Sequence, residues 1–335
     1  TLIMISIKEL RKNKKAYKDS LMKRGDKFDL ENIIQIDSQI RAMKTSASNM
    51  RAQRNAASET IGEAKKSGQD ASEEILKTRQ LGDKLNNLET ELNGLELNLE
   101  KILRRIPNIP HESVPDGFTE SDNLEIRKWG EKVEFNFKPK NHMDLGDGLK
   151  LFDFKTAAKL SGSGFPLYTG KGAELERKLI NSMLEFHVRE YKYKEVFPPV
   201  LMLKDSMITT GQLPKFQEDM YHTEVDNLFL APTAEVPVTN IHRDDILEES
   251  DLPKYYVAYS PCFRRESGSY GKDTRGLLRV HQFNKVELVK FSKPEDSYNE
   301  LELLTSQAES VLKKLGLHYR VISLCAGDLS FSAAK

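Results

Sequence analysis

The sequence contains few cysteines and no long apolar run, and both absences exclude whole classes of protein. Among its 335 residues only Cys262 and Cys325 are cysteines, too few to cross-link a chain of this length or to form a four-cysteine zinc site. No apolar stretch approaches the roughly 20 residues that cross a bilayer, and no signal-peptide pattern opens the chain. Lys plus Arg and Asp plus Glu each total 51, so the chain as a whole is not a polycation. We therefore expect a cytoplasmic, multi-domain protein that does not contact a membrane.

Several common catalytic motifs are also missing. There is no Rossmann fingerprint, and residues 164–171 fail as a P-loop because five residues separate the glycines and Gly172 takes the position of the required Ser or Thr. The seven histidines show no spacing typical of metal ligands, so we expect no metal site formed by the protein alone. Neither cysteine lies in a nucleophile motif, and both are explained equally well as small buried apolar side chains.

A heptad pattern of apolar residues fills most of the first third of the chain. Its spacings of three and four average 3.5, the period of a coiled-coil seam. Two such runs flank a polar stretch between Gly62 and Ser72, which predicts an antiparallel helical hairpin with legs at about 28–62 and 73–106. At 1.5 Å per residue each leg is about 50 Å long, so the hairpin projects into solvent. The first run is Ile33, Ile36, Ile40, Met43, Ala47, Met50, Arg54, Ala57 and Ile61, and the second is Leu81, Leu85, Leu88, Leu92, Leu95, Leu99, Ile102 and Ile106.

Basic side chains line the first leg of this hairpin, where no acidic residue interrupts positions 39–57. They form either a contact for a polyanion or an ordinary solvated face. Residues 1–25 pose the same choice, with eight basic residues against Glu9 and Asp19 on an expected amphipathic helix. The basic residues of the leg are Arg41, Lys44, Arg51 and Arg54, of which Arg54 falls on the seam itself and has register specification as a further explanation.

Prolines and glycine at 107–117 end the helical pattern, and short apolar segments follow. We expect an arm at 1–106, a linker at 107–120 and a second domain at 121–335. The second domain is predicted as α+β, with an antiparallel sheet flanked by helices. Its expected strands are 194–200, 228–230, 255–260, 282–291 and 319–324, and its expected helices are 173–188 and 295–315.

Residues 262–287 are predicted to form a strand, a long Gly-containing loop and a returning strand. The basic residues of this hairpin outnumber the acidic ones, and planar guanidinium groups match phosphate oxygens bidentately. Phe283 on the returning strand offers an aromatic face to a base. The alternative is a basic, flexible surface loop. The basic residues are Arg264, Arg265, Lys272, Arg275, Arg279 and Lys285, and the acidic ones are Glu266, Asp273 and Glu287.

A second candidate is the turn that follows the expected strand 228–230. There Glu235 is placed to hold an ammonium group, although Thr233 could equally cap the next helix with Glu235 in its first turn.

Together these motifs resemble the seryl-tRNA synthetases, which are class II aminoacyl-tRNA synthetases. The resemblance rests on residues 263–266 (FRRE), 274–277 (TRGL), 281–283 (HQF) and 233–235 (TAE). Residues 168–199 look like the first motif of the class, a long helix and a strand at the dimer interface. The heptad hairpin is similar to the tRNA-binding arm of the family, so the resemblance covers essentially the whole chain.

The resemblance implies a reaction and its partners. Serine and ATP form seryl-adenylate with release of pyrophosphate, and the seryl group then passes to tRNA(Ser). Mg²⁺ bridges the ATP phosphates, the enzyme is a homodimer, and neither DNA nor a membrane is a partner.

The resemblance also implies a role for each matching residue. Arg264 and Glu266 are the catalytic pair, with Arg264 on the α-phosphate and Glu266 on the adenine amino group. Glu235 and Glu287 hold the ammonium and hydroxyl groups of serine. The ATP-binding set is Arg264, Arg265, Glu266, Val280 and Phe283; the serine-binding set is Thr233, Ala234, Glu235 and Glu287; the tRNA-binding set is Arg41, Lys44, Arg51, Arg54 and Arg275.

The sequence departs from the family pattern at two places. Arg265 stands where the family often has a small polar residue. The chain also ends at Lys335, before the third motif of the class, so we expect an incomplete catalytic domain and a chain with little or no activity.

Two other functions compete with this one. A non-catalytic paralogue could serve as an RNA-binding or regulatory module, but the intact set of Arg264, Glu266, Glu235 and Glu287 opposes it. The other is a synthetase-like enzyme that activates a different amino acid or loads a carrier protein. Loading a carrier does not need the helical arm, so the arm favours tRNA.

Overall fold

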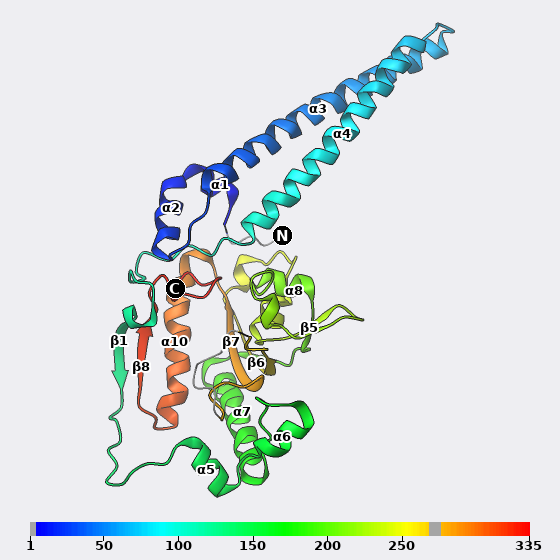
Figure 1. Cartoon of the computed structure of the whole chain (residues 1–335). Helices are drawn as coiled ribbons and strands as arrows, with labels where there is room; N and C mark the ends of the chain where they lie inside the picture. The colour runs from blue at the N-terminus through cyan, green and yellow to red at the C-terminus, as the bar shows by residue number, and fades with distance from the viewer. Residues whose placement is uncertain (1–4, 268–275) are drawn as a thin grey trace. The chain divides into compact units, whose positions relative to one another are not determined.

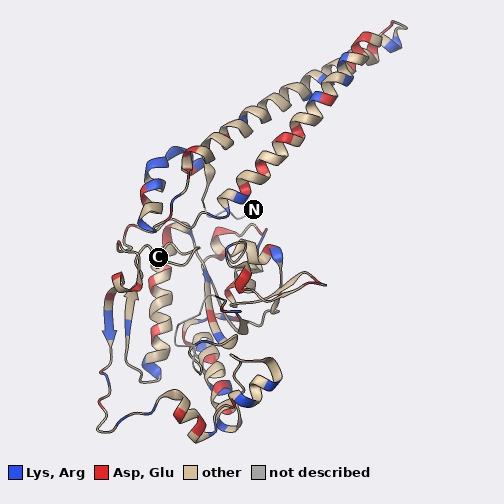
Figure 2. Ribbon diagram, viewed as in Figure 1, with Lys and Arg blue, Asp and Glu red and all other residues tan. Residues whose placement is uncertain are grey.

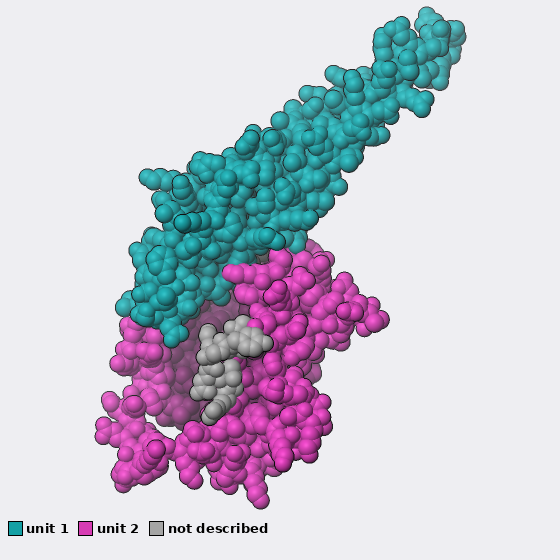
Figure 3. Space-filling model, viewed as in Figure 1, with its two compact units in different colours: residues 1–124, 323–335 teal, residues 125–322 magenta. Residues whose placement is uncertain are grey.

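The computed structural model describes residues 5–267 and 276–335, which fall into two compact units. One unit comprises residues 1–124 and 323–335, and the other comprises residues 125–322 (Figure 3). The first unit therefore combines the N-terminal third of the chain with its last residues. In the described part of the chain, no helix is long and apolar enough to cross a membrane.

The first unit is built on a long helical hairpin, as the heptads predict. Helix α3 (Leu30–Lys66) and helix α4 (Ser72–Leu103) run side by side in opposite directions (Figure 1). Two ion pairs cross the hairpin, Lys44 with Glu96 and Arg51 with Glu89. The partners run in opposite sequence order on the two helices, as expected for an antiparallel pair. The buried seam residues include Ile33, Ile36, Ile40 and Ala47 on α3 and Leu85, Leu92, Leu99 and Leu103 on α4.

The ends of the hairpin helices differ by a few residues from the expected bounds. Helix α3 continues through Gly62 to Lys66, because one glycine costs a long helix only about 1 kcal/mol relative to alanine. At its start, the Asp29 carboxylate accepts a hydrogen bond from the Asn32 amide at 3.0 Å, which is an N-cap. The Asp70 carboxylate accepts one from the Ser72 amide at the start of α4, so the turn between the legs spans residues 67–71.

The single amphipathic helix expected within residues 1–25 is wrong. The segment forms two short helices, α1 (Ile7–Lys12) and α2 (Lys14–Lys23), with the backbone leaving helical geometry at Asn13. The break lets Leu10 and Leu21 enter one core with α3 and α4 from two different helices. Much of the ribbon of α1 and α2 is blue in Figure 2, the colour that marks Lys and Arg.

A buried arginine ties the end of the chain to the base of the hairpin. The Arg24 guanidinium donates to the carbonyls of Leu329 and Ser330, both at 2.9 Å, and to that of Ala333 at 3.1 Å. It also reaches the Asn108 carbonyl at 3.3 Å. The proline-rich stretch after α4 is thus packed against residues 323–335 within the same unit.

The second unit centres on a three-stranded sheet. Strands β6 (Lys254–Phe263) and β7 (Gln282–Phe291) pair antiparallel along their full lengths, and β2 (Lys194–Val196) pairs with β6 in parallel. Helices α7 (Gly170–Tyr191) and α10 (Ser297–Lys314) pack on the sheet. The α+β architecture is confirmed, although the expected strand 194–200 ends at Val196, just before Phe197 and two prolines.

Smaller elements complete the second unit. Strands β3 (Leu201–Leu203), β5 (Leu228–Leu230) and β4 (His222–Thr223) form an antiparallel sheet. Strands β1 (Leu124–Trp129) and β8 (Tyr319–Ser323) form a two-stranded sheet. The remaining helices are α5 (His142–Leu149), α6 (Phe154–Ser161), α8 (Lys204–Thr209) and α9 (Glu235–Thr239), with 3-10 turns at Gln217–Asp219, Asn240–His242, Glu249–Asp251 and Pro294–Asp296. A further 3-10 turn, Glu120–Asp122, belongs to the first unit.

Candidate active site

The β6–β7 hairpin brings together most of the residues expected to bind ligands. Side chains alternate between the two faces of a strand, so Phe283, Lys285 and Glu287 share one face of β7. The turn after β5 lies beside the end of β6, where the Phe263 amide donates to the Ala231 carbonyl at 3.0 Å. The turn after β5 and the β6–β7 hairpin thereby form one site.

Arg264 directly follows β6 and is fixed at both its backbone and its side chain. Its amide donates to the His281 carbonyl at 2.9 Å, which extends the β6–β7 pairing by one step. Its Nε donates to the Pro232 carbonyl at 3.3 Å, and its guanidinium lies 5.0 Å from the centroid of the Phe283 ring. These contacts leave the terminal nitrogens of Arg264 available for an anion beside an aromatic surface.

Thr233 links the turn after β5 to strand β7. Its hydroxyl donates to Glu287 Oε2 at 2.6 Å and accepts from Lys285 Nζ at 2.6 Å. It also accepts from the Glu235 amide at 3.2 Å, but the N-cap position of α9 is Ala234 and has no side-chain cap. Thr233 is therefore not the cap of α9, although Glu235 lies in the first turn of that helix as expected.

The Glu235 carboxyl group has a raised pKa. Loss of water around the carboxyl is the largest cause and repulsion by Glu287 is the second, while Lys285 and Arg264 oppose the shift. Glu235 is exposed as a residue, so its carboxylate borders solvent as well as these three charges. Two cations and two carboxylates thus share the site, and their formal charges balance.

Glu266 and its neighbours lie farther along the same hairpin. The Glu266 carboxylate accepts a short hydrogen bond from Arg279, and its backbone has a φ of 51°. The Arg265 amide donates to the Asp219 carbonyl at 2.9 Å. Val280, on the returning segment, is buried. Arg275, which the sequence suggests as a tRNA contact, lies outside the described residues.

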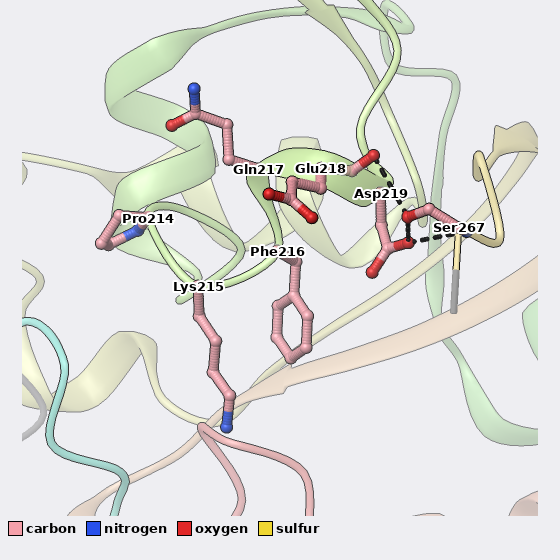
Figure 4. A pocket seen from close by; sticks show the side chains of 7 residues that line it. All are labelled: Pro214, Lys215, Phe216, Gln217, Glu218, Asp219 and Ser267. Carbon is pink, nitrogen blue, oxygen red and sulfur yellow. Dashed lines mark hydrogen bonds between the residues drawn. The ribbon is translucent and has the colours of Figure 1, made fainter.

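A cavity of about 480 Å³ lies next to Arg265 and Glu266. Figure 4 shows its lining, in which the Asp219 carboxylate accepts a 3.0 Å hydrogen bond from the Ser267 amide and a shorter one from the Ser267 hydroxyl. The 3-10 turn Gln217–Asp219 is thereby attached to the start of the loop that follows β6. The lining residues are Pro214, Lys215, Phe216, Gln217, Glu218, Asp219 and Ser267.

Two residues that sequence reasoning did not select take part in the site. Lys285 was counted only as one of the basic residues of the hairpin, yet it contacts both Thr233 and Glu287. The period of two along β7, which puts Lys285 between Phe283 and Glu287, is the signal that could have found it. His281 donates from Nδ1 to the Arg264 carbonyl at 3.1 Å, and no sequence pattern indicates that contact.

On the arm, three of the four basic residues expected to bind tRNA form ion pairs. Arg41 pairs with Asp37 on its own helix, whereas Lys44 and Arg51 pair with Glu96 and Glu89 across the hairpin. All three side chains remain more than half exposed. In the part of the chain that the structure describes, the half-buried Arg54 side chain forms no ion pair.

Two family models match the chain. One describes the N-terminal domain of seryl-tRNA synthetase and covers residues 4–110, and the other describes the class II tRNA synthetase core domain and covers residues 216–335. A serine–tRNA ligase from Geobacillus kaustophilus is 52% identical over 333 residues, which are 99% of this chain and 78% of that protein. The chain belongs to the seryl-tRNA synthetase family.

Other members of this family agree in sequence and in fold. The serine–tRNA ligase of Geobacter sulfurreducens is 49% identical over 99% of this chain and 78% of its own length. A crystal structure of seryl-tRNA synthetase from Pyrococcus horikoshii, complexed with ATP, has a TM-score of 0.90 at 35% identity and covers 99% of this chain and 79% of that chain. A serine–tRNA ligase from Naegleria fowleri, in complex with AMP, has a TM-score of 0.82 at 26% identity over 96% of this chain and 74% of that one. The chain is a class II serine–tRNA ligase, and the non-catalytic alternative is not favoured.

Proposed function

We propose that the site between β6, β7 and the turn at 231–235 binds serine and ATP side by side and joins them as seryl-adenylate. The observation that carries this proposal is the shared position of Arg264 and Thr233. Arg264 is bonded to the Pro232 carbonyl, and the next residue, Thr233, is bonded to Glu287. A phosphate held by Arg264 therefore lies next to the carboxylates that hold an amino acid.

Arg264 binds the α-phosphate of ATP and stabilises the negative charge that builds up as the serine carboxylate attacks phosphorus. A guanidinium that is already positioned costs little reorganisation at this step, which is why such electrostatic terms are large in catalysis. Phe283 stacks on the adenine ring, and Val280 lines the nucleotide pocket. Glu266 accepts a hydrogen bond from the adenine amino group and Arg265 completes the phosphate contacts.

Serine is held by Thr233, Ala234, Glu235 and Glu287. The two carboxylates bind its ammonium and hydroxyl groups, and a site built to bond a hydroxyl strongly rejects an amino acid that lacks it. Mg²⁺ would be bound through ATP and would neutralise charge on its phosphates. In the described residues, no group of three or more His, Cys, Asp or Glu side chains is placed to hold a metal ion.

The helical arm binds tRNA(Ser) through its phosphates. Lys44 and Arg51 exchange their partners Glu96 and Glu89 for phosphate oxygens, and this exchange costs little because an exposed ion pair contributes only about 0–1 kcal/mol. Arg41 and Arg54 extend the contact along α3, and Arg275 completes the proposed tRNA-binding set. DNA is not a partner.

The enzyme acts as a homodimer in the cytoplasm. The surface that supports a dimer lies around α7 and the segment after β2, where Phe197 is 79% exposed and Leu175 is 52% exposed. A cavity of about 470 Å³ on this surface is lined by Tyr168, Glu176, Phe197 and Asn284, among others. Large exposed apolar side chains around a hollow are typical of a protein interface.

The test is a calorimetric titration with sulfamoyl analogues of aminoacyl-adenylates. The seryl analogue is expected to bind at least about ten times more tightly than the alanyl and glycyl analogues, because these lack the hydroxyl that Glu235 and Glu287 recognise together with the ammonium. The threonyl analogue has both groups, so it is expected to bind at least about ten times more weakly because its extra methyl does not fit the pocket. Equal affinity for the alanyl analogue, or preference for another amino acid, contradicts the proposal.

A further inference from the structure

Lys285 contacts the carboxylate that we assign to the substrate. Its Nζ lies 2.5 Å from Glu287 Oε2 and 2.6 Å from the Thr233 hydroxyl. The Lys285 side chain is 31% exposed and that of Glu287 is 21% exposed, so the pair is accessible from the site. In this structure the Lys285 ammonium group is therefore paired with Glu287, one of the two carboxylates that are proposed to bind serine.

Lys290, on the same strand, has a purely structural role and serves as a comparison for Lys285. The Lys290 side chain is only 4% exposed, bonds to Glu300 at 2.8 Å and lies 4.2 Å from the centroid of the Tyr255 ring. Its contacts come from β6 and α10, outside the site. Among the described residues no aromatic ring covers Lys285, and Thr233 and Glu287, which bond to it, are both assigned to bind serine.

We propose that Lys285 is the resident cation of the serine pocket: it neutralises Glu287 and Glu235 while the pocket is empty, and it gives up Glu287 when the ammonium group of serine arrives. The inference rests on the proposed serine site. Binding then exchanges one ammonium for another, so the pocket never holds two uncompensated carboxylates. An amino acid enters favourably because it brings its own positive charge.

The charges around Lys285 support this role. Glu235 faces it from α9, Glu287 from its own strand, and Arg264 from the end of β6; the Cys262 thiol lies on β6 with its pKa raised by burial, so it adds no charge near neutral pH. The positive charge of Lys285 lowers the pKa of the Glu235 carboxyl and so opposes the repulsion from Glu287, which raises it. Without Lys285, Arg264 is the one remaining cation among these groups, and the Glu235 carboxylate binds a proton more readily.

The experiment compares serine binding by the wild type and by Lys285→Met, which keeps the length of the side chain and removes its charge. Calorimetric titrations with L-serine are made between pH 5 and pH 8. Serine needs ionised carboxylates, so its affinity falls as the pH is lowered. The proposal predicts that Lys285→Met moves the midpoint of this loss upward by about one pH unit or more, as expected for removal of a cation a few ångströms from two carboxylates. At pH 8 the variant binds serine at least as tightly as the wild type, because the competing ammonium is gone.

Two further variants separate this role from a general structural one. Lys285→Arg keeps the charge and is expected to restore the wild-type midpoint. Lys293→Met removes a lysine charge just beyond β7, where Lys293 pairs with Glu249, and is expected to leave the midpoint unchanged.

Two outcomes would contradict the role of Lys285 or the serine site itself. If Lys285→Met weakens serine binding by the same factor at every pH, or leaves the midpoint in place, the resident-cation role is wrong while the serine site stands. If the wild type binds no serine at any pH, the proposed function itself fails.

Discussion

The guanidinium of Arg264 lies 5.0 Å from the centroid of the Phe283 ring, at the point where β6 gives way to its loop and β7 begins. One residue is suited to phosphate and the other to a flat base, and the antiparallel register sets them side by side. The same register pairs Ser260 with Lys285 and Ala258 with Glu287, so the amino-acid end of the site continues along the hairpin.

Removing either member of the Arg264–Phe283 pair is expected to weaken binding of the seryl-adenylate analogue. Arg264→Ala loses charge-assisted hydrogen bonds and is expected to lower affinity about 100-fold. Phe283→Ala loses base stacking and is expected to lower it about tenfold. Calorimetry measures both, with Arg189→Ala on the exposed face of α7 as the control. If Arg264→Ala binds the analogue as tightly as the wild type does, Arg264 does not bind the phosphate.

Serine binding is expected to weaken as the solution becomes more acidic. The pKa of Glu235 is raised, first by burial and then by Glu287, so this carboxylate takes up a proton at a higher pH than an ordinary glutamate. Its protonated form cannot pair with an ammonium group, so affinity is present above the raised pKa and is lost as the pH falls through it. Glu235→Gln is expected to bind serine more weakly at pH 8 and to flatten the pH profile. A profile that keeps its wild-type shape in Glu235→Gln assigns the titration to another group.

Replacing the basic residues of the first leg is expected to weaken tRNA binding and its dependence on salt. Each lost phosphate contact lowers the slope of log affinity against log salt by about 0.7–0.9, so four contacts lower it by about 3. The variant changes Arg41, Lys44, Arg51 and Arg54 to Gln. The control removes the same charge from the second leg by changing Lys77, Arg79, Lys84 and Lys101 to Gln.

Filter-binding titrations over a range of salt concentrations measure this difference between the two legs. Circular dichroism checks that both variants keep their helices. An equal loss of slope in both variants means that only net charge matters and that α3 has no dedicated tRNA face.

The contacts of Arg24 are expected to stabilise the first unit. Arg24→Met leaves four carbonyls without their donor, at a cost of about 3 kcal/mol or more. For a unit of this size the midpoint of thermal unfolding is expected to fall by about 10 °C. Arg105→Met, at an exposed position next to the end of α4, is the control. A midpoint that is equal in the two variants shows that the carbonyl contacts of Arg24 contribute no stability.

A charge at Phe197 is expected to separate the proposed dimer. Phe197 is 79% exposed, so Phe197→Asp costs little in the folded chain but places a carboxylate in an apolar interface. Light scattering is expected to give the mass of one chain for this variant and of two for the wild type. Val225→Asp, at a residue that is 96% exposed on the loop between β4 and β5, is the control. A monomeric wild type contradicts the dimer.

The helical hairpin of α3 and α4 was predictable because the heptad spacing of its apolar residues repeats over many residues. The break at Asn13 was not, because it depends on Leu10 and Leu21 meeting a core formed by α3 and α4. The period of β7 predicts which of its residues share a face, but it does not say which loop faces them. The contact between Thr233 and Glu287 joins segments 54 residues apart, and only the tertiary structure brings them together.

The central claim is that one seryl-adenylate contacts Arg264, Glu235 and Glu287 at the same time. A crystal structure of the protein with the seryl sulfamoyl analogue tests it directly. We expect the analogue's sulfamoyl group, in the place of the α-phosphate, within about 3 Å of the Arg264 guanidinium, and its ammonium group at a similar distance from a Glu235 or Glu287 carboxylate. An analogue bound elsewhere, or bound at Arg264 with its seryl end turned away from both carboxylates, contradicts the account.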